Sequence, residues 1–318
     1  MKKIAARIAS LCALLCWTAL LVAADFDYGL KPRQIAPGTY VLEGRNEDFS
    51  FANGGNIVNT GFIVTDIGVI VIDSGPSLRY GEQLRQAIAT ITDKPVLRVF
   101  ITHAHPDHFL GNQAFPAATL YATSAAKEQM QREGNAFAEN MYRLNGDWMK
   151  GTESLPPAQT IGAGRITLGG HELELLPLHG HTASDLALYD RTTGVLFAGD
   201  LVFNHRAPTT PHAHIADWLA SLDTLESLTR QPGFTRLVPG HGTVTADAAP
   251  IAETRSYLQW LTSTIRQGAE QGEDMNEVMA HAKPAAFRDM AVIDSEYRRS
   301  VGHLFPAAEQ EALKPHRH

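Results

Sequence analysis

Thr102-His103-Ala104-His105-Pro106-Asp107-His108 places three imidazoles and one carboxylate within six consecutive positions. The mostly apolar residues 96–101 precede this segment and predict a buried strand that delivers it to the edge of a sheet. Imidazole nitrogens and carboxylate oxygens are the ligands that zinc takes where no thiolate is available. The segment therefore predicts a metal site at the end of a strand rather than a solvated surface turn.

The spacing within this segment suits two ions. Residues two apart in an extended chain point to the same side, so His103 and His105 can bind one ion together. Pro106 interrupts regular strand pairing, and Asp107 and His108 then turn toward a neighbouring ion. One short segment can therefore serve two metals.

Further candidate ligands follow the predicted strands at residues 173–176, 195–197 and 236–238. Small residues beside each candidate let the backbone turn tightly around an ion. A carboxylate also ends the predicted strand at residues 68–73, where it either caps the following helix or orients a ligand by hydrogen bonding. These candidates are Asp73, His181 with His179 as its competitor, Asp200 and His241.

In this order the motifs resemble those of the metallo-β-lactamase superfamily of hydrolases. The resemblance covers about residues 35–242 and implies an α/β fold, the four-layer αβ/βα sandwich. Residues 243–318 then form a helical C-terminal extension, and residues 25–318 make up a single domain. The five matching motifs are Val71-Ile72-Asp73-Ser74-Gly75, the H-x-H-x-D-H segment, Gly180-His181-Thr182, Gly199-Asp200 and Gly240-His241-Gly242.

The resemblance implies two zinc ions, with iron as the alternative metal because imidazole and carboxylate bind both. Asp107 would orient the bridging hydroxide and handle its proton as the catalytic residue, whereas Asp73 would support a ligand. Gly-His-Thr is the usual form of the third motif, which favours His181 over His179, with Thr182 as a candidate support for the ligand. The implied ligands are His103, His105 and His181 for one ion, Asp107, His108 and His241 for the other, and Asp200 as a bridge.

The N-terminus predicts a cleaved signal peptide at residues 1–24. Lys2, Lys3 and Arg7 precede the apolar residues 8–22, and small residues follow before Asp25. The apolar run is short for a membrane span, and an uncleaved anchor is the alternative. Both cysteines of the chain lie in this segment, which excludes a Cys-ligated centre in a periplasmic or secreted mature protein and makes β-lactamase activity a minor alternative.

Charge argues against nucleic acid as a partner. The chain carries 27 basic and 34 acidic residues, a formal charge of −7. Cleavage before Asp25 would remove three basic residues and leave a charge of −10. Such an excess of acidic groups opposes binding to a phosphate backbone, so a small molecule is the predicted substrate.

Two regions are candidates for shaping the substrate pocket. Residues 124–150 predict a helical insertion, either packed on the core or forming a lid. His205 and Arg206 follow the fourth motif, and Arg206 would pair either with an anionic substrate group or with a structural carboxylate. His212 and His214 in the same loop are expected to line the pocket or to lie at the surface.

The chain is therefore expected to be an exported di-zinc hydrolase that cleaves an ester, thioester or related bond. Segments such as Asn59-Thr60-Gly61-Phe62 and Asn204-His205-Arg206 resemble SoxH-like exported proteins, the quinoprotein relay system zinc metallohydrolases, which implies a quinoprotein dehydrogenase partner. The alternatives are a noncatalytic or redox accessory of such a system and a persulfide dioxygenase-like enzyme with one iron. The complete second ligand set argues against a single iron.

Overall fold

The computed structural model describes residues 26–314. The predicted signal peptide, both cysteines, and His316 and His318 lie outside the described residues. Between residues 26 and 314, no helix has both the length and the apolar character that crossing a membrane requires.

The first sheet has seven strands in sequence order. Pairing is antiparallel from β1 to β4 and parallel from β4 to β7. The H-x-H-x-D-H segment leaves this sheet at the carboxyl end of β5. The strands are β1 (Arg33–Ala36), β2 (Thr39–Leu42), β3 (Thr60–Val64), β4 (Val69–Ile72), β5 (Val96–Phe100), β6 (Leu120–Ala122) and β7 (Gln159–Thr160).

The second sheet has five strands in the order β12-β11-β10-β9-β8. Its strands pair in antiparallel fashion except β11 and β12, which are parallel. The parallel pair brings the ends of β11 and β12 to the same edge of the sheet. The strands are β8 (Gly164–Leu168), β9 (His171–Leu178), β10 (Asp185–Asp190), β11 (Val195–Phe203) and β12 (Arg236–His241).

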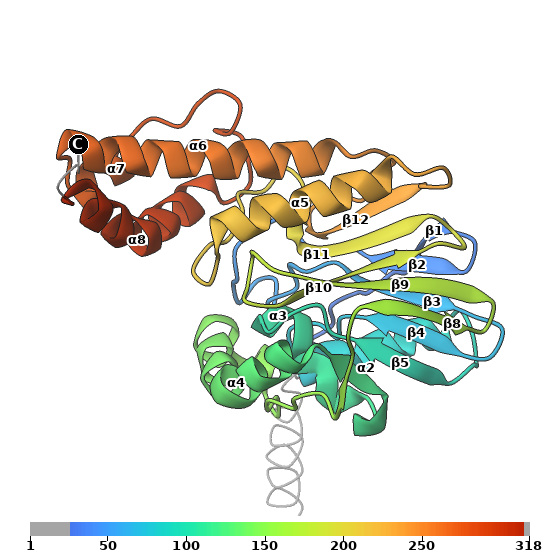
Figure 1. Ribbon diagram of the computed structural model, residues 1–318. Coiled ribbons are helices and arrows are strands. Elements are labelled where there is room, and N and C mark those ends of the chain that lie inside the picture. Colours follow the sequence, from blue (N-terminus) through green and yellow to red (C-terminus); the bar gives the residue numbers. More distant parts are fainter. Residues whose placement is uncertain (1–25, 315–318) are drawn as a thin grey trace, which may run out of the picture.

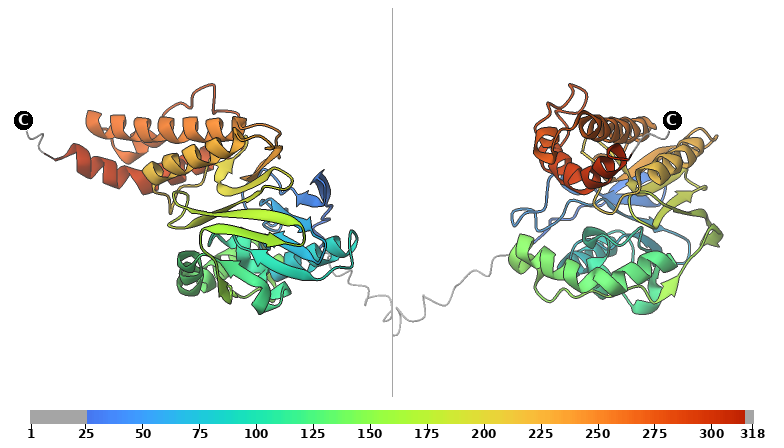
Figure 2. Two further views of the ribbon diagram at one scale, coloured as in Figure 1. Left: turned by 45° about the vertical axis from the view of Figure 1, so that its right-hand side comes forward. Right: turned by 60° about the vertical axis from the view of Figure 1, so that its left-hand side comes forward.

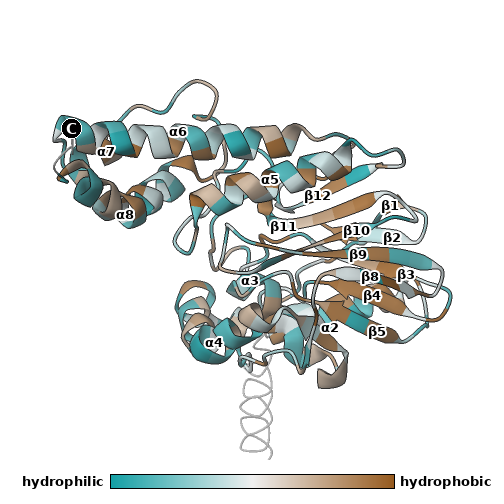
Figure 3. Cartoon of the chain, viewed as in Figure 1, coloured by the Kyte–Doolittle hydropathy of each residue, from teal (hydrophilic) through white to brown (hydrophobic). Residues whose placement is uncertain are grey.

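The two sheets pack face to face, with helices on both outer faces (Figures 1 and 2). The packing of strand β4 explains why all four of its residues are apolar. Ile70 and Ile72 point into the cluster between the sheets, whereas Val69 and Val71 pack against the helices. Each face of the strand is covered, so alternate side chains are buried on opposite sides. Figure 3 shows the strands coloured mainly as hydrophobic between the two helical layers.

Helices α2 (Leu78–Ala89) and α4 (Ser124–Asn145) pack on the first sheet, together with the short α3 (Pro106–Phe109). Helices α5 (Ile215–Thr229) and α6 (Ala249–Gln271) cover the second sheet, and α8 (Ile293–Ala312) and the short α7 (Met275–Met279) pack against α6. Figure 1 shows these two helical layers on opposite sides of the sheets. The predicted four-layer α/β fold with a helical C-terminal part is confirmed.

Two details of the local predictions differ from the structure. Asp200 was expected at the end of a short strand, but it lies inside the nine-residue strand β11, which continues to Phe203. Helix α2 is capped by the Ser77 hydroxyl, which accepts a hydrogen bond from the backbone N–H of Tyr80 at 3.0 Å, so Asp73 is not its cap. The predicted insertion forms α4 and a 3₁₀ turn (Gly146–Met149), and its Met130 and Met141 are buried in the core.

Candidate metal centre

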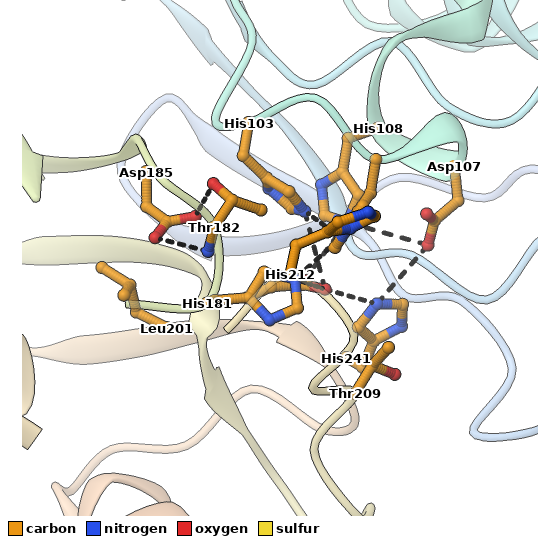
Figure 4. Close-up of polar contacts among 12 residues, drawn as sticks. His103, Asp107, His108, His181, Thr182, Asp185, Leu201, Thr209, His212 and His241 are labelled. Atoms are coloured by element: carbon orange, nitrogen blue, oxygen red, sulfur yellow. Dashed lines mark hydrogen bonds and ion pairs between the residues drawn. The ribbon is translucent and has the colours of Figure 1, made fainter. Parts of the chain in front are cut away.

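Three imidazoles from two segments of the chain converge at the first candidate ion position (Figure 4). Nδ1 of His105 lies 3.0 Å from Nε2 of His103 and 2.8 Å from Nε2 of His181. A carboxylate oxygen of Asp200 lies within the same cluster, in which all ligand atoms are within 4.8 Å of one another. His103 and His105 follow β5, while His181 lies in the connection from β9 to β10, so both sheets contribute.

The second cluster contains Asp107, His108 and His241. Oδ2 of Asp107 lies 3.7 Å from Nε2 of His108 and 3.4 Å from Nε2 of His241. Asp200 reaches both clusters, because its Oδ1 is 3.2 Å from Nε2 of His108 and its Oδ2 is 3.3 Å from Nε2 of His181. The structure thus brings all seven residues of the predicted ligand set to one place.

The outer nitrogens of three imidazoles hold the rings in the orientation that metal binding needs. Nδ1 of His108 donates to Oδ2 of Asp73 at 2.8 Å, and Nδ1 of His241 donates to the carbonyl of Ile57 at 2.7 Å. Nδ1 of His103 lies 3.0 Å from the Thr102 hydroxyl. With Nδ1 protonated, the Nε2 lone pair of each ring faces the cluster, as in metal-binding histidines whose other nitrogen is hydrogen-bonded.

Asp73 lies beneath the ligands and does not join either cluster. It is buried, and its backbone adopts a left-handed conformation with φ of 59°. Its carboxylate accepts hydrogen bonds from the backbone N–H of Thr102 at 2.8 Å and from the Thr102 hydroxyl at 2.9 Å. The Thr102 hydroxyl hydrogen therefore points to Asp73, which leaves the hydroxyl oxygen to accept from His103.

The third-motif region differs from the expected arrangement in one respect. Nδ1 of His179 donates to the carbonyl of Ala183 at 2.8 Å, so this side chain turns away from the clusters. Thr182 was expected to support His181, but its hydroxyl donates to Oδ1 of Asp185 at 2.8 Å. Nδ1 of His181 is buried and, within residues 26–314, makes no hydrogen bond. The ring is instead packed against Trp218, with 5.1 Å between ring centroids.

The charges of the site fit bound divalent cations. Burial lowers the pKa of His103 and His105 well below the ordinary value, so both are neutral, the form that binds a metal. Burial would raise the pKa of Asp200, but the imidazoles of His241 and His108 outweigh it and hold the pKa well below its ordinary value. Burial would also lower the pKa of His108, yet three surrounding carboxylates raise it well above that of a free imidazole.

This electrostatic balance shows that the site attracts positive charge. Oδ1 of Asp200 and Nε2 of His108 are buried and lie 3.2 Å apart, but neither makes a well-aligned hydrogen bond with the described residues. Buried polar atoms without partners are rare in folded proteins, and a convergent set of them is typical of an ion site. The donor set of five imidazoles and two carboxylates fits two zinc ions, and it also fits iron.

Two glycines allow Asp200 to reach the centre of the site. Gly199 has a positive φ of 53°, and the pairing of β11 with β12 shifts register at this residue. Gly240 on β12 faces Asp200 so closely that an added Cβ would lie 1.9 Å from its Oδ1. The strands therefore approach at a point where only hydrogen fits.

We expect Gly240→Ala to displace Asp200 and weaken metal binding by about 10- to 100-fold, the range seen when a ligand loses its support. Zinc affinity measured by competition with a chromogenic chelator checks this. Gly162→Ala is the matched control, because an added Cβ there has no neighbour within 4 Å. Equal zinc affinities for the two variants would contradict the proposed role of the close approach.

A pocket of about 90 Å³ opens beside both clusters. The loop before β3 contributes Asp48 and Phe49, and the connection after β11 contributes Thr209. Helix α8 contributes Glu296 and Arg299, so the C-terminal extension forms part of the pocket wall. These wall residues come from segments far apart in the sequence.

Of the two residues that the sequence predicted to line the pocket, only one does so. Arg206 lines the pocket and is only 2% exposed, and its Nη1 donates to the carbonyl of Glu47. His205 was predicted to line the pocket as well, but its side chain is 80% exposed and pairs with Glu253. A left-handed backbone at His205, with φ of 51°, turns the two adjacent side chains in different directions. His205 is therefore outside the pocket.

The sequence analysis did not identify the residues that hydrogen-bond to the ligand rings or hold the neighbouring loop. Thr102, Ile57 and the α8 residues were not singled out, and His212 was assigned only to the pocket or the surface. Nδ1 of His212 in fact lies 2.9 Å from Nε2 of His105. Thr102, next to His103, was the one local signal, since a hydroxyl beside a ligand is well placed to bond its ring.

Comparisons with known proteins agree with this geometry. The sequence profile of the metallo-β-lactamase superfamily matches residues 53–241. Acyl-coenzyme A thioesterase MBLAC2 of Gallus gallus is 26% identical over 60% of this chain and 74% of its own length. The linear primary-alkylsulfatase of Pseudomonas sp. is 21% identical over 74% of this chain, which spans about half of that protein, 52%.

Solved structures share the fold. A metallo-β-lactamase from Pontibacter korlensis superimposes with a TM-score of 0.57 at 22% identity, over 72% of this chain and 99% of that protein. The sec-alkylsulfatase Pisa1 of Pseudomonas sp. gives a TM-score of 0.66 at 18% identity, over 90% of this chain and 52% of that protein. The hydrolase relatives and the two ligand clusters define a metal-dependent hydrolase. The chain belongs to the metallo-β-lactamase superfamily.

Proposed function

We propose that the protein is an exported di-zinc hydrolase that cleaves a carboxylic ester or thioester carrying an anionic group. The observation that carries this proposal is the set of seven buried ligand residues beside a pocket lined by Arg206. Two relatives support acyl transfer to water: the acyl-coenzyme A thioesterase, and the hydroxyacylglutathione hydrolase of Nitrosococcus oceani, 30% identical over 49% of this chain and 53% of that enzyme.

The seven ligand residues would hold two zinc ions, which would supply Lewis acidity and a bound water of lowered pKa. The carboxylate of Asp107 faces the second cluster at the pocket, where it can orient the attacking water and accept its proton. Asp200 lies between the clusters, and its negative charge offsets the repulsion between two cations. Burial of Asp107 and Asp200 strengthens these interactions.

Arg206 supports the preference for an anionic substrate. Within the described residues, no carboxylate lies within 4.0 Å of its guanidinium, although Glu296, Asp107 and Asp200 are near enough to favour its charge. Its Nε is buried without a hydrogen-bond partner between residues 26 and 314. A buried, unpaired cation is costly unless a ligand completes its environment. The structural ion pair considered for Arg206 is absent from the described part of the chain.

The test combines metal analysis of the purified mature protein with a hydrolysis screen before and after chelation. The screen contains p-nitrophenyl acetate, an acyl-coenzyme A, a dodecyl sulfate and a penicillin. We expect about two zinc ions per chain and chelator-sensitive cleavage of the ester and the thioester. One iron per chain, or two metals with no cleavage of any compound, would favour the persulfide dioxygenase-like or accessory alternatives.

Arg206→Gln should raise KM for the anionic thioester by about 10-fold or more, since hydrogen bonds to charged groups contribute about 1.5–3 kcal/mol. KM for the uncharged p-nitrophenyl acetate should change little. Arg266→Gln, on an exposed part of α6, is the matched control. An equal rise in KM for both substrates would refute the charge recognition by Arg206.

Sulfate ester hydrolysis is the second candidate. The alkylsulfatase aligns with 74% of this chain, more than the 60% aligned with the thioesterase, and a sulfate group suits the unpaired Arg206 guanidinium. Cleavage of dodecyl sulfate without cleavage of the thioester would select this candidate. Penicillin cleavage would select the β-lactamase alternative.

Export and a quinoprotein dehydrogenase partner are further parts of the proposal. Export rests on the basic, apolar and small-residue order of residues 1–24, and the partner rests on the SoxH-like segments. N-terminal sequencing of periplasmic protein should find a chain that begins near Asp25. Recovery of Met1 in the membrane fraction would contradict cleavage, and failure of a purified quinoprotein dehydrogenase to bind the mature protein would contradict the partnership.

A further inference from the structure

His105 differs from the other imidazoles of the centre in the nitrogen it turns inward. Its Nδ1 faces His103 and His181 at 3.0 and 2.8 Å, whereas the other rings present Nε2. A neutral ring that binds a metal through Nδ1 must carry its proton on Nε2. That N–H therefore points away from the ions and needs an acceptor.

His212 supplies this acceptor. Nε2 of His105 lies 2.9 Å from Nδ1 of His212, and the two ring centroids are 5.2 Å apart. Phe137 of α4 packs edge-on against both rings, with centroid distances of 6.5 Å to His105 and 6.3 Å to His212. Figure 4 shows His212 over the cluster that contains His181 and His103.

The loop that carries His212 is held by the C-terminal extension. The Thr210 hydroxyl donates to Oγ of Ser300 at 2.7 Å, and the Thr209 hydroxyl donates to Oε1 of Glu296 at 2.9 Å. Ser300 and Glu296 are fully buried on α8. These two bonds hold the loop at positions 210 and 209, two and three residues before His212.

We propose that His212 is a positioning residue for His105, and that helix α8 holds it there through the loop between β11 and α5. The superfamily profile ends at residue 241, so α8 lies outside the matched region, and its bonds to Thr209 and Thr210 connect it to the loop of His212. The inference rests on the proposed metal site, because His105 must bind its ion through Nδ1. It adds a support for the one ligand whose ring is reversed.

The first experiment measures zinc affinity by chelator competition without substrate. His212→Ala should weaken zinc binding by about 10- to 100-fold, the usual effect of removing a ligand's hydrogen-bond partner. His212→Asn should restore most of the affinity, because its Oδ1 takes the place of Nδ1 as an acceptor. His214→Ala is the matched control, since His214 is exposed and pairs with Asp217.

The second experiment tests the connection to α8. Ser300→Ala should weaken zinc binding in the same direction as His212→Ala, and it should have little further effect when combined with that substitution. Additive losses in the double variant would refute the transmission through Thr210, and unchanged affinity in His212→Ala with an intact circular dichroism spectrum would refute the positioning role. A wild-type chain that binds no zinc would contradict the proposed function itself, which separates the two failures.

Discussion

Asp107→Ala should lower kcat by about two to four orders of magnitude while the fold stays intact, the range expected when general acid–base catalysis is lost. Asp107 is 4% exposed, and its Oδ2 lies 3.4 Å from Nε2 of His241, so the substitution removes a ligand and a proton acceptor together. Asp107 lies in the first turn of the short helix α3, and its side chain is not part of the hydrophobic core. Thermal stability of the loaded protein should therefore fall less than turnover.

The measurement is kcat for the best ester or thioester, with zinc content determined on the same samples. Asp107→Asn separates the two roles, because the amide keeps an oxygen toward the ion but cannot accept the proton. Asp93→Ala, at an exposed position after α2, is the control. Near-normal turnover in a fully loaded Asp107→Asn sample would eliminate the proton-handling role.

Removal of zinc should both abolish turnover and lower the melting temperature. Asp73, Asp107 and Asp200 bury their carboxylates within one site, and bound cations compensate their charge. A ligand at 1,000 times its dissociation constant stabilises a protein by about 4 kcal/mol, which corresponds to roughly 6 °C for a domain of this size. Two ions that bind more tightly would give a larger shift.

Differential scanning calorimetry before and after dialysis against a chelator gives this shift. Addition of zinc, but not of magnesium, should restore both the melting temperature and the turnover, because imidazole ligands suit zinc better than magnesium. A melting temperature that stays constant while the zinc content falls to zero would show that the buried carboxylates are stabilised without metal.

The sequence predicts the layers and the ligands because both depend on local patterns. The four consecutive buried apolar residues of β4 fit a strand covered on both faces, and the H-x-H-x-D-H segment keeps four ligand residues within six positions. The end of β11 was predicted wrongly because a glycine at position 199 is typical of the residue that follows a strand. In the structure the register shifts around Gly199, and Phe203 pairs again with His241 of β12.

The supports of the centre were not predicted because they depend on tertiary contacts. His212 and His105 are 107 positions apart, and Thr209 and Glu296 are 87 positions apart. No periodicity within one segment carries information about such pairs. Likewise, the sequence gives no reason to place His205 and Arg206 differently relative to the pocket. The left-handed backbone at His205, which turns the two side chains in different directions, is visible only in the structure.

The contribution of α8 to the pocket sets an order of events during synthesis. Glu296, Arg299 and Ser300 lie in α8, the last helix within residues 26–314, whereas every candidate ligand has been made by residue 241. A growing chain therefore contains all of its candidate metal ligands before it contains the helix that holds the loop of His212. Tight metal loading is expected to follow release of the finished polypeptide, so a prematurely terminated product would have the ligands but not the completed centre.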